Sequence, residues 1–315
     1  MVGDGLGSRG VPIRERAPAK VNLTFEVGPL RPDGFHAVQS VMAAVEWADE
    51  VRLHTVPGGG PDRVRVRGRA APTGRDNLAL RAVAAVREAQ PDLPAIVVEL
   101  HKRLPAGAGL GGGSSDAGAV LRALARLRGT FRTEALAPGL GSDVPFFAAA
   151  LPVALATGRG EQLTPLPPLP ADWRLVLVLP PFSLSTRLVY RRLDALRGGR
   201  VPTLGNASER LAQALVAYAA GGGGTTGEQA LMECLDRVEN DLWPAALSLR
   251  PALRSVHGRL RAAVGPAVPV ALTGSGSALF AVMTDGAGAA AAAQGLRRQG
   301  IWARVVRPLG AADGR

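Results

Sequence analysis

Hydrophobic and polar side chains alternate near the start of the chain in a way that predicts a strand. Between residues 19 and 27 every second position is apolar, a period of two that is typical of a half-buried β-strand. Lys20 and Asn22 would then lie side by side on its polar face. That face has two interpretations, a functional site or a solvated surface.

Further elements follow in the first half of the chain. Short apolar runs at 51–53 and 64–66 predict two more strands. Apolar residues spaced three and four apart over 78–89 predict an amphipathic helix, with Asp76 as its N-cap.

A cluster of prolines at 165–170 predicts a domain boundary. We therefore expect a disordered, glycine-rich segment at 1–12, one domain at 13–164 and a second at 171–315. The end of the chain predicts the order α-β-β-α-β, typical of an open α/β sandwich of ferredoxin-like type. The elements predicted beyond the prolines are a strand at 175–179, helices at 207–219, 227–238, 252–264 and 287–299, and strands at 268–273, 278–283 and 302–306.

Composition adds a basic character. The chain has 315 residues, of which 47% are hydrophobic, enough to bury a sizeable core. Its 37 basic and 26 acidic residues give a net charge of +11. Nucleic-acid binding is one interpretation, but the charges are scattered and aromatic residues make up only 4%. We expect instead a positive field that attracts nucleotide and diphosphate substrates, and no nucleic-acid partner.

Other protein classes are disfavoured. Cys234 is the only cysteine, which excludes a disulfide framework, and the four histidines lack metal-ligand spacing, so no protein-held metal is expected. The sequence has no apolar run of about 18 residues and no apolar signal core. It therefore predicts a cytoplasmic protein with no membrane partner.

The strongest chemical signal is the segment 105–118, PAGAGLGGGSSDAG. Its glycines let backbone N–H groups come close to a ligand, and the helix predicted after it adds unpaired N–H donors and partial positive charge. Together they predict a phosphate cradle, with a flexible linker as the alternative. The Gly-Lys-Ser/Thr ending of a Walker loop is missing, and the match to a dinucleotide pattern is a weak signal.

This segment resembles the second motif of the GHMP kinases, the superfamily of galactokinase, homoserine kinase, mevalonate kinase and phosphomevalonate kinase. The segments 17–23 and 272–278 resemble the first and third motifs of that superfamily. The blocks 31–36 and 141–147 are similar to those of one family within it, the 4-diphosphocytidyl-2-C-methyl-D-erythritol kinases.

The resemblance implies an α+β fold of two domains, a ribosomal-S5-like N-terminal domain that binds ATP and a ferredoxin-like C-terminal domain. It implies ATP-dependent phosphorylation of the 2-hydroxyl of 4-diphosphocytidyl-2-C-methyl-D-erythritol (CDP-methylerythritol), in non-mevalonate (methylerythritol phosphate) isoprenoid precursor biosynthesis. Mg²⁺ would arrive with ATP, and the protein would be a monomer or weak homodimer. A GHMP kinase of homoserine or mevalonate type is the alternative.

The resemblance also implies a catalytic pair, Lys20 and Asp143. Asp143 precedes an apolar Val-Pro-Phe-Phe run and could act as base toward a substrate hydroxyl. Lys20 could stabilise charge on the transferring phosphoryl group. From the residues alone, a turn aspartate before proline is the alternative for Asp143.

On the nucleotide side the resemblance assigns Asn77 and Lys102 to the adenine end. Helix capping is the alternative for Asn77, and a solvated charge at a strand end is the alternative for Lys102. Ser114 or Ser115 could contact a Mg²⁺ bound to phosphate. The residues predicted to bind ATP through the loop are Pro105, Ala106, Gly107, Ala108, Gly109, Leu110, Gly111, Gly112, Gly113, Ser114 and Ser115.

The cytidyl side departs from the family in one residue, because Phe35 stands where the family has tyrosine. A phenylalanine ring still stacks on a cytosine but loses one polar contact. Tyr190 is the candidate for the opposing ring, with a core tyrosine as the alternative, and His36 could read the cytosine edge. The other predicted substrate-binding residues are Asn22, Thr186, Thr273, Gly274, Ser275 and Gly276.

Overall fold

The chain forms two compact units in a computed structural model that describes residues 11–57, 59–129, 132–222, 225–236 and 240–310. The first unit contains residues 11–19, 47–106 and 111–150. The second unit contains residues 20–46, 107–110 and 151–310. Most of the segment predicted to be disordered, 1–12, lies outside the described residues.

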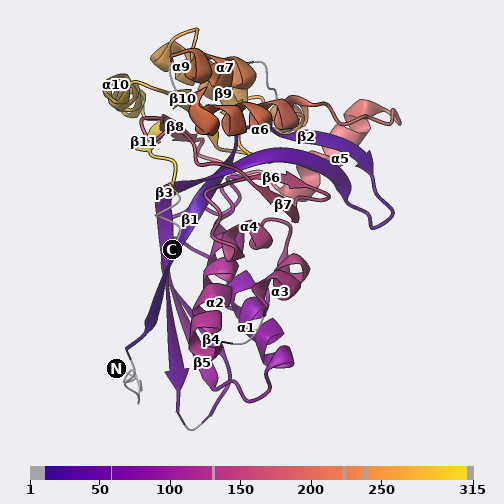
Figure 1. Cartoon of the computed structure of the whole chain (residues 1–315), viewed down its shortest axis with the longest axis vertical. Coiled ribbons are helices and arrows are strands. Elements are labelled where there is room, and N and C mark those ends of the chain that lie inside the picture. The colour runs from indigo at the N-terminus through magenta and orange to yellow at the C-terminus, as the bar shows by residue number, and fades with distance from the viewer. Residues whose placement is uncertain (1–10, 58, 130–131, 223–224, 237–239, 311–315) are drawn as a thin grey trace. The chain divides into compact units, whose positions relative to one another are not determined.

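Strands covered on one side by helices build the first unit (Figure 1). It contains β1 (Ile13–Asn22) up to residue 19 and β3 (His36–Val56) from residue 47 onward. Its other elements are β4 (Arg63–Gly68), β5 (Ala95–Lys102), α1 (Leu78–Ala89), α2 (Gly112–Arg128), α3 (Thr133–Leu140) and α4 (Val144–Ala148). β4 runs parallel to β5, and β5 is antiparallel to the second half of β3, from Glu50 opposite His101 to Val56 opposite Ala95. β1 also pairs with β3.

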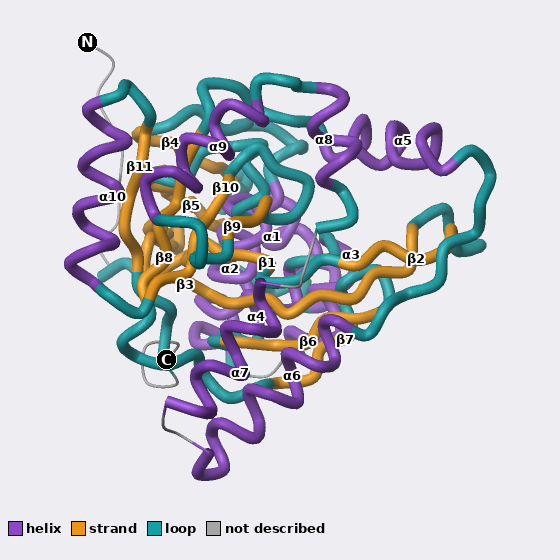
Figure 2. The backbone as a smooth tube through the Cα atoms, turned by 90° about the horizontal axis from the view of Figure 1, so that it is seen from above, coloured by secondary structure: helices purple, strands orange, loops and turns teal. Residues whose placement is uncertain are grey.

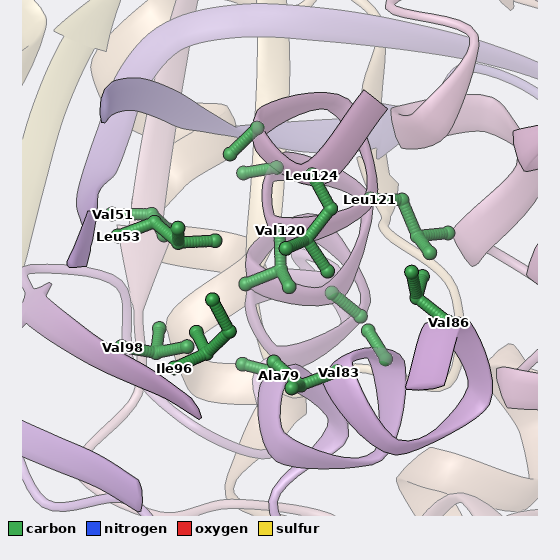
Figure 3. Close-up of a cluster of buried hydrophobic side chains, with 14 of the residues drawn as sticks. Val51, Leu53, Ala79, Val83, Val86, Ile96, Val98, Val120, Leu121 and Leu124 are labelled. Carbon is green, nitrogen blue, oxygen red and sulfur yellow. The ribbon is translucent and has the colours of Figure 1, made fainter. Parts of the chain in front are cut away.

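The core of the first unit lies between these strands and α1 and α2 (Figure 3). Alternate residues of β3 and β5, among them Leu53 and Ile96, share one buried cluster with apolar residues at helical spacing on α2, among them Val120 and Leu124. Burying each such side chain contributes about 1.5–3 kcal/mol. Gly118 lets α2 approach α4 closely, because an added Cβ would lie 2.6 Å from the Cβ of Phe147.

The second unit contains a four-stranded antiparallel sheet and the strands that pair with the first half of β3. Its further elements are β2 (Glu26–Leu30), β6 (Val153–Thr157), β7 (Gln162–Pro165), β8 (Arg174–Leu179), β9 (Val270–Leu272), β10 (Leu279–Met283), β11 (Trp302–Val306), α5 (Thr186–Arg197), α6 (Ala207–Ala217), the π-helical turn η1 (Tyr218–Gly222), α7 (Thr225–Asp236), α8 (Trp243–Leu249), α9 (Leu253–Val264) and α10 (Gly286–Arg298). The four-stranded sheet has the order β11-β8-β10-β9. β2 and β6 pair antiparallel with the first half of β3, and β7 pairs with β6.

Two helices of the second unit, α9 and α10, pack on this sheet, and α5 packs against α8. α10 packs against β11 and β8, and α6 and α7 lie side by side (Figure 2). The order α9-β9-β10-α10-β11 confirms the predicted α-β-β-α-β arrangement, and β8 completes the sheet. Within the described residues, no helix has the length and apolar character needed to cross a bilayer.

Two local predictions were wrong. The half-buried strand at 19–27 is broken, because β1 ends at Asn22 and β2 begins at Glu26, and the polar residues Lys20 and Asn22 are as buried as their apolar neighbours. The helix at 78–89 is present, but its N-cap is Asn77 instead of Asp76.

The compact units also cut across the domains predicted at 13–164 and 171–315. The strand β3 supplies residues to both units, pairing through its first half with β6 and through its second half with β5. Residues 20–46 therefore belong to the same compact unit as residues 151–310. The predicted domains are continuous stretches of sequence, whereas the compact units are groups of residues in contact. The two-domain division near the prolines therefore stays a prediction.

Candidate functional site

The glycine loop between β5 and α2 has the backbone that its sequence predicts. Gly107, Gly109 and Gly111 have φ angles of 68°, 77° and 72°, a left-handed conformation that favours glycine. Gly111 is the N-cap of α2, and no side chain of the described residues caps that helix. The first N–H groups of α2 are therefore not occupied by a capping side chain, which is what an anion site at a helix N-terminus requires.

Gly109 also brings the loop against the third motif, and both segments belong to the second unit. A Cβ added to Gly109 would lie 2.2 Å from the carbonyl oxygen of Thr273, a distance that no side chain tolerates. The N–H of Ala278 donates to the carbonyl of Ala108 at 3.1 Å. Glycine at 109 is thus required by close approach of two backbones as well as by its φ angle.

The first motif joins the same place. Lys20 Nζ donates to Asn22 Oδ1, and the N–H of Asn22 donates to Thr273 Oγ1 at 3.0 Å. A Cβ on Gly274 would lie 3.3 Å from Lys20 Nζ, so the ammonium group faces the backbone of the third motif. The prediction that Lys20 and Asn22 are neighbours is confirmed, and Asn22 is further held by Ser40 Oγ at 2.7 Å.

Asn240 supports the third motif and was missed by sequence reasoning. Its side-chain nitrogen donates to the carbonyls of Leu272 and Gly274, each at 2.8 Å, and its Oδ1 accepts the N–H of Leu242 at 2.9 Å. The bond to Leu242 is local, but Leu272 and Gly274 lie 32 and 34 positions away along the chain, so residue spacing does not indicate that Asn240 supports the third motif.

The predicted cytidyl side also lies in the second unit. The ring of His36 stacks on Tyr190, with 5.4 Å between centroids and 26° between planes. His36 Nδ1 lies 3.1 Å from the carbonyl oxygen of Gly28, and Nε2 lies 3.1 Å from Asp194 Oδ1. Tyr190 also packs against the core of this unit, as the alternative interpretation expected.

Phe35 and Thr186, two further residues of the predicted cytidyl side, contact other parts of the second unit. Phe35 is half exposed, and the guanidinium carbon of Arg159 lies 5.1 Å from the centre of its ring. Thr186 Oγ1 is 2.9 Å from Ser275 Oγ, which links α5 to the third motif. A cytosine held between Phe35 and Tyr190 stays a prediction.

In the first unit, Asn77 acts as a helix cap. Its Oδ1 accepts the N–H of Ala79 at 2.9 Å, and its Nδ2 donates to the carbonyl of Pro72 at 2.6 Å. Both ends of the side-chain amide are engaged within the turn, which supports the capping alternative. A contact of Asn77 with adenine stays a prediction.

Asp143 lies immediately before α4, in the N-cap position, with its residue partly exposed. The apolar run that follows it is buried, and Phe146 and Phe147 meet edge to face at 5.3 Å. Asp143 belongs to the first unit and Lys20 to the second, and their action as a pair stays a prediction.

Lys102 is not a solvated charge at a strand end. Its Nζ donates to Asp49 Oδ2 and, at 2.5 Å, to Asp116 Oδ2, and its side chain is 6% exposed. Burial raises the pKa of Asp116 to about 7. The positive charge of Lys102 acts to lower this pKa, and the negative charge of Asp49 acts to raise it. Sequence reasoning missed Asp49, because nothing marks an aspartate in the middle of a long strand as a partner of residues more than fifty positions away.

Comparison with known proteins places these observations in a family. Residues 77–149 match the model of the GHMP kinases N terminal domain. The 4-diphosphocytidyl-2-C-methyl-D-erythritol kinase of Anaeromyxobacter sp. strain Fw109-5 is 38% identical over 299 residues, covering 92% of this chain and 88% of the relative. The same enzyme of Salinibacter ruber is 34% identical over 300 residues, covering 91% and 95%.

Solved structures agree. A crystal structure of 4-(cytidine 5'-diphospho)-2C-methyl-D-erythritol kinase superposes with a TM-score of 0.71 at 35% identity, covering 94% of this chain and 99% of that one. The homoserine kinase of Cytophaga hutchinsonii superposes with a TM-score of 0.65 at 20% identity, covering 97% of each chain. The second likeness concerns the fold alone.

Proposed function

The chain belongs to the 4-diphosphocytidyl-2-C-methyl-D-erythritol kinases, a family of GHMP kinases, and we propose that it transfers the γ-phosphoryl group of ATP to the 2-hydroxyl of CDP-methylerythritol. That step belongs to the methylerythritol phosphate route to isoprenoid precursors. The observation that carries the proposal is the meeting of the first motif with the third motif and with Gly109 in the second unit. Motifs about 250 residues apart converge on one ammonium group, Lys20, as phosphoryl transfer requires.

The glycine loop binds the phosphates of ATP in this account. Three left-handed glycines turn the backbone, and the uncapped N-terminus of α2 supplies N–H donors and partial positive charge. This arrangement attracts a polyphosphate without a Walker lysine.

Mg²⁺ bound with ATP would neutralise part of the phosphate charge. Of the two serines at the start of α2, Ser114 fits this role, because it is partly exposed whereas Ser115 is fully buried. We therefore assign the hydroxyl contact to Ser114 and a packing role to Ser115.

Asp143 takes the proton of the attacking hydroxyl, and Lys20 stabilises the charge that develops on the phosphoryl oxygens. The buried run that follows Asp143 fixes its backbone, since a short helix with proline in its first turn begins there. The hydrogen bond from Lys20 to Asn22 restricts the ammonium group to one position beside the third motif.

The cytidyl group binds at the aromatic residues of the second unit. Tyr190 is held by its stack with His36, whose two ring nitrogens are each fixed by a neighbour. A ring with a fixed orientation offers a stacking surface at low entropic cost. Phe35 supplies the other aromatic surface without the hydroxyl that the family usually has there.

Three finer points belong to the same proposal. We expect the enzyme in the cytoplasm, with a single cysteine and no need of disulfides. We expect a monomer or weak homodimer. We expect no acceptor role for homoserine or mevalonate, because the aromatic residues at Phe35 and Tyr190 suit a base.

A coupled assay of ADP release tests the proposal across CDP-methylerythritol, homoserine and mevalonate as acceptors. Turnover with CDP-methylerythritol exceeding that with the other two by at least about 10³-fold in kcat/KM is expected, because binding of the cytidyl group contributes to the transition state. Comparable turnover of homoserine or mevalonate would replace this function with the alternative one.

A further inference from the structure

Three charged side chains form a buried cluster in the first unit, at the end of β5. Asp49 comes from β3, Lys102 from β5 and Asp116 from α2, and their side chains are 0%, 6% and 5% exposed. Lys102 Nζ donates to one oxygen of each carboxylate. Burying three charges is unfavourable unless each is paired, and here each of the three has a partner of opposite charge.

The cluster holds the segment that enters the glycine loop. Asp49 Oδ1 accepts the backbone N–H of Arg103 and, at 2.8 Å, that of Leu104. These residues follow β5 directly and lead into the loop at Pro105. One carboxylate therefore fixes both the direction of the backbone and the position of the Lys102 ammonium group.

The cluster also holds the segment that leaves the loop. Asp116 lies one turn into α2, and a Cβ added to Gly112, the first residue of that helix, would lie 3.6 Å from Lys102 Nζ. The ammonium group thus lies directly beneath the first turn of α2. Through Lys102 the entry and the exit of the loop are joined in one hydrogen-bonded unit.

The residue type at 102 supports a specific role for the ammonium group. The chain has 37 basic residues, and Lys20 and Lys102 are its only lysines. In a chain that otherwise uses arginine, both lysines are buried and lie in segments tied to the phosphate chemistry. An ammonium group is a compact point charge that fits between two carboxylates and a glycine backbone, whereas the planar guanidinium fork of arginine is larger.

We infer that the Asp49–Lys102–Asp116 cluster is a positioning device for the glycine loop, and that Lys102 affects nucleotide binding through the loop and not by touching the adenine. The inference rests on the proposed function insofar as the loop binds the phosphates of ATP. It differs from the adenine contact that the family resemblance implies for Lys102, because both carboxylates that hold Nζ lie within the fold of the first unit.

Binding of two ligands separates the two roles of Lys102. The affinities of ATP and of inorganic tripolyphosphate, which has no base, are measured by calorimetry in the full chain at about pH 8, where Asp116 is largely ionised. Lys102→Met should weaken both ligands by the same factor, about 10- to 100-fold, because a displaced loop loses its phosphate contacts. Weakening of ATP alone, or of neither ligand in a folded variant, would overturn the inference.

Variants of Asp116 keep the test decisive if Lys102→Met fails to fold. Asp116→Ala removes the hydrogen bond between Lys102 and α2 but leaves the Lys102–Asp49 pair. It should weaken the binding of ATP and of tripolyphosphate by the same factor, about 10- to 100-fold. Asp116→Asn keeps an acceptor oxygen and should restore affinity to within about threefold of the parent. Equal affinity of the alanine and asparagine variants would contradict the role of the link.

Arg81→Met is the matched control, because it removes one positive charge from an exposed position on α1 and should change neither affinity. No acceptor is present in these binding experiments. Failure of the positioning role is therefore distinguishable from failure of the proposed function, which is judged by turnover of CDP-methylerythritol.

Discussion

At the scale of single residues, Asp143 carries the heaviest chemical role. Asp143→Asn should lower kcat by about 10²- to 10⁴-fold, because a general base acts mainly in the transition state. The dissociation constant for ATP, measured by calorimetry, should stay within about threefold of the parent. A kcat within about tenfold of the parent would contradict the assignment of Asp143 as base.

Asp116 gives the stability of the protein a defined pH dependence. Its pKa is raised by burial to about 7 in the folded chain and is about 4 in the unfolded chain, so the folded state binds the proton more tightly. This carboxyl therefore stabilises the fold fully below about pH 4, and that stabilisation is lost as the pH rises through about 7.

Urea unfolding of the parent and of Asp116→Asn at a series of pH values measures this effect. The difference in unfolding free energy between the two should change by up to about 1.4 kcal/mol per pH unit between about pH 4 and 7, with the parent losing stability relative to the variant as the pH rises. A constant difference across that range would show that Asp116 titrates normally.

Residue patterns predicted some contacts of the site and missed others for a physical reason. The period of two in β1 placed Lys20 beside Asn22, because alternation is a property of the local backbone. Asp49 and Asn240 were missed, because their partners are reached only through the tertiary fold. Long-range hydrogen bonds to backbone groups leave no trace in residue spacing.

At the scale of elements, the glycine loop makes a prediction of its own. Gly109→Ala should lower the free energy of unfolding by at least about 1–2 kcal/mol, from the left-handed φ angle alone, and further through the collision with the Thr273 carbonyl. Gly295→Ala in α10, where an added Cβ meets nothing within 4 Å, should instead stabilise the protein by about 0.5–1 kcal/mol. Urea unfolding measures the free energy of unfolding of both variants. Equal changes in the two variants would contradict the close approach of Gly109 to Thr273.

The helix α5 makes a second prediction, through Tyr190. Tyr190→Ala should raise the KM for CDP-methylerythritol by about 5- to 150-fold, since stacking on one base contributes about 1–3 kcal/mol, and should leave the KM for ATP unchanged. Tyr218→Ala, at the only other tyrosine, serves as the control and should change neither value. Equal rises in both KM values would mean that Tyr190 acts only in the core.

Elements with a clear period were predictable, and irregular ones were not. The helix at 78–89 and the α-β-β-α-β order at the end of the chain follow from regular apolar spacing and from turn residues. The break between β1 and β2 was missed, because the apolar alternation continues across it. Burial on both faces of β1 was missed as well, since polar residues that satisfy one another can be buried.

At the scale of the whole molecule, the fold and the family could be predicted from motifs, but the grouping of the chain into compact units could not. Proline density at 165–170 marks a change of composition, whereas the contacts follow the strand β3, whose two halves pair in different units. A single strand of 21 residues is unusually long, and only its residues 51–53 were predicted as a strand.

The central claim is that this chain places a phosphate on the 2-hydroxyl of CDP-methylerythritol. Phosphorus and carbon NMR of the product formed from ATP and CDP-methylerythritol tests it most directly, since coupling between phosphorus and carbon identifies the substituted position. We predict one new phosphomonoester, attached at the C2 oxygen and formed in equal amount to ADP, and its formation should be at least about 10²-fold slower with Asp143→Asn. A phosphate at another position, or ADP without a phosphorylated acceptor, would contradict the account.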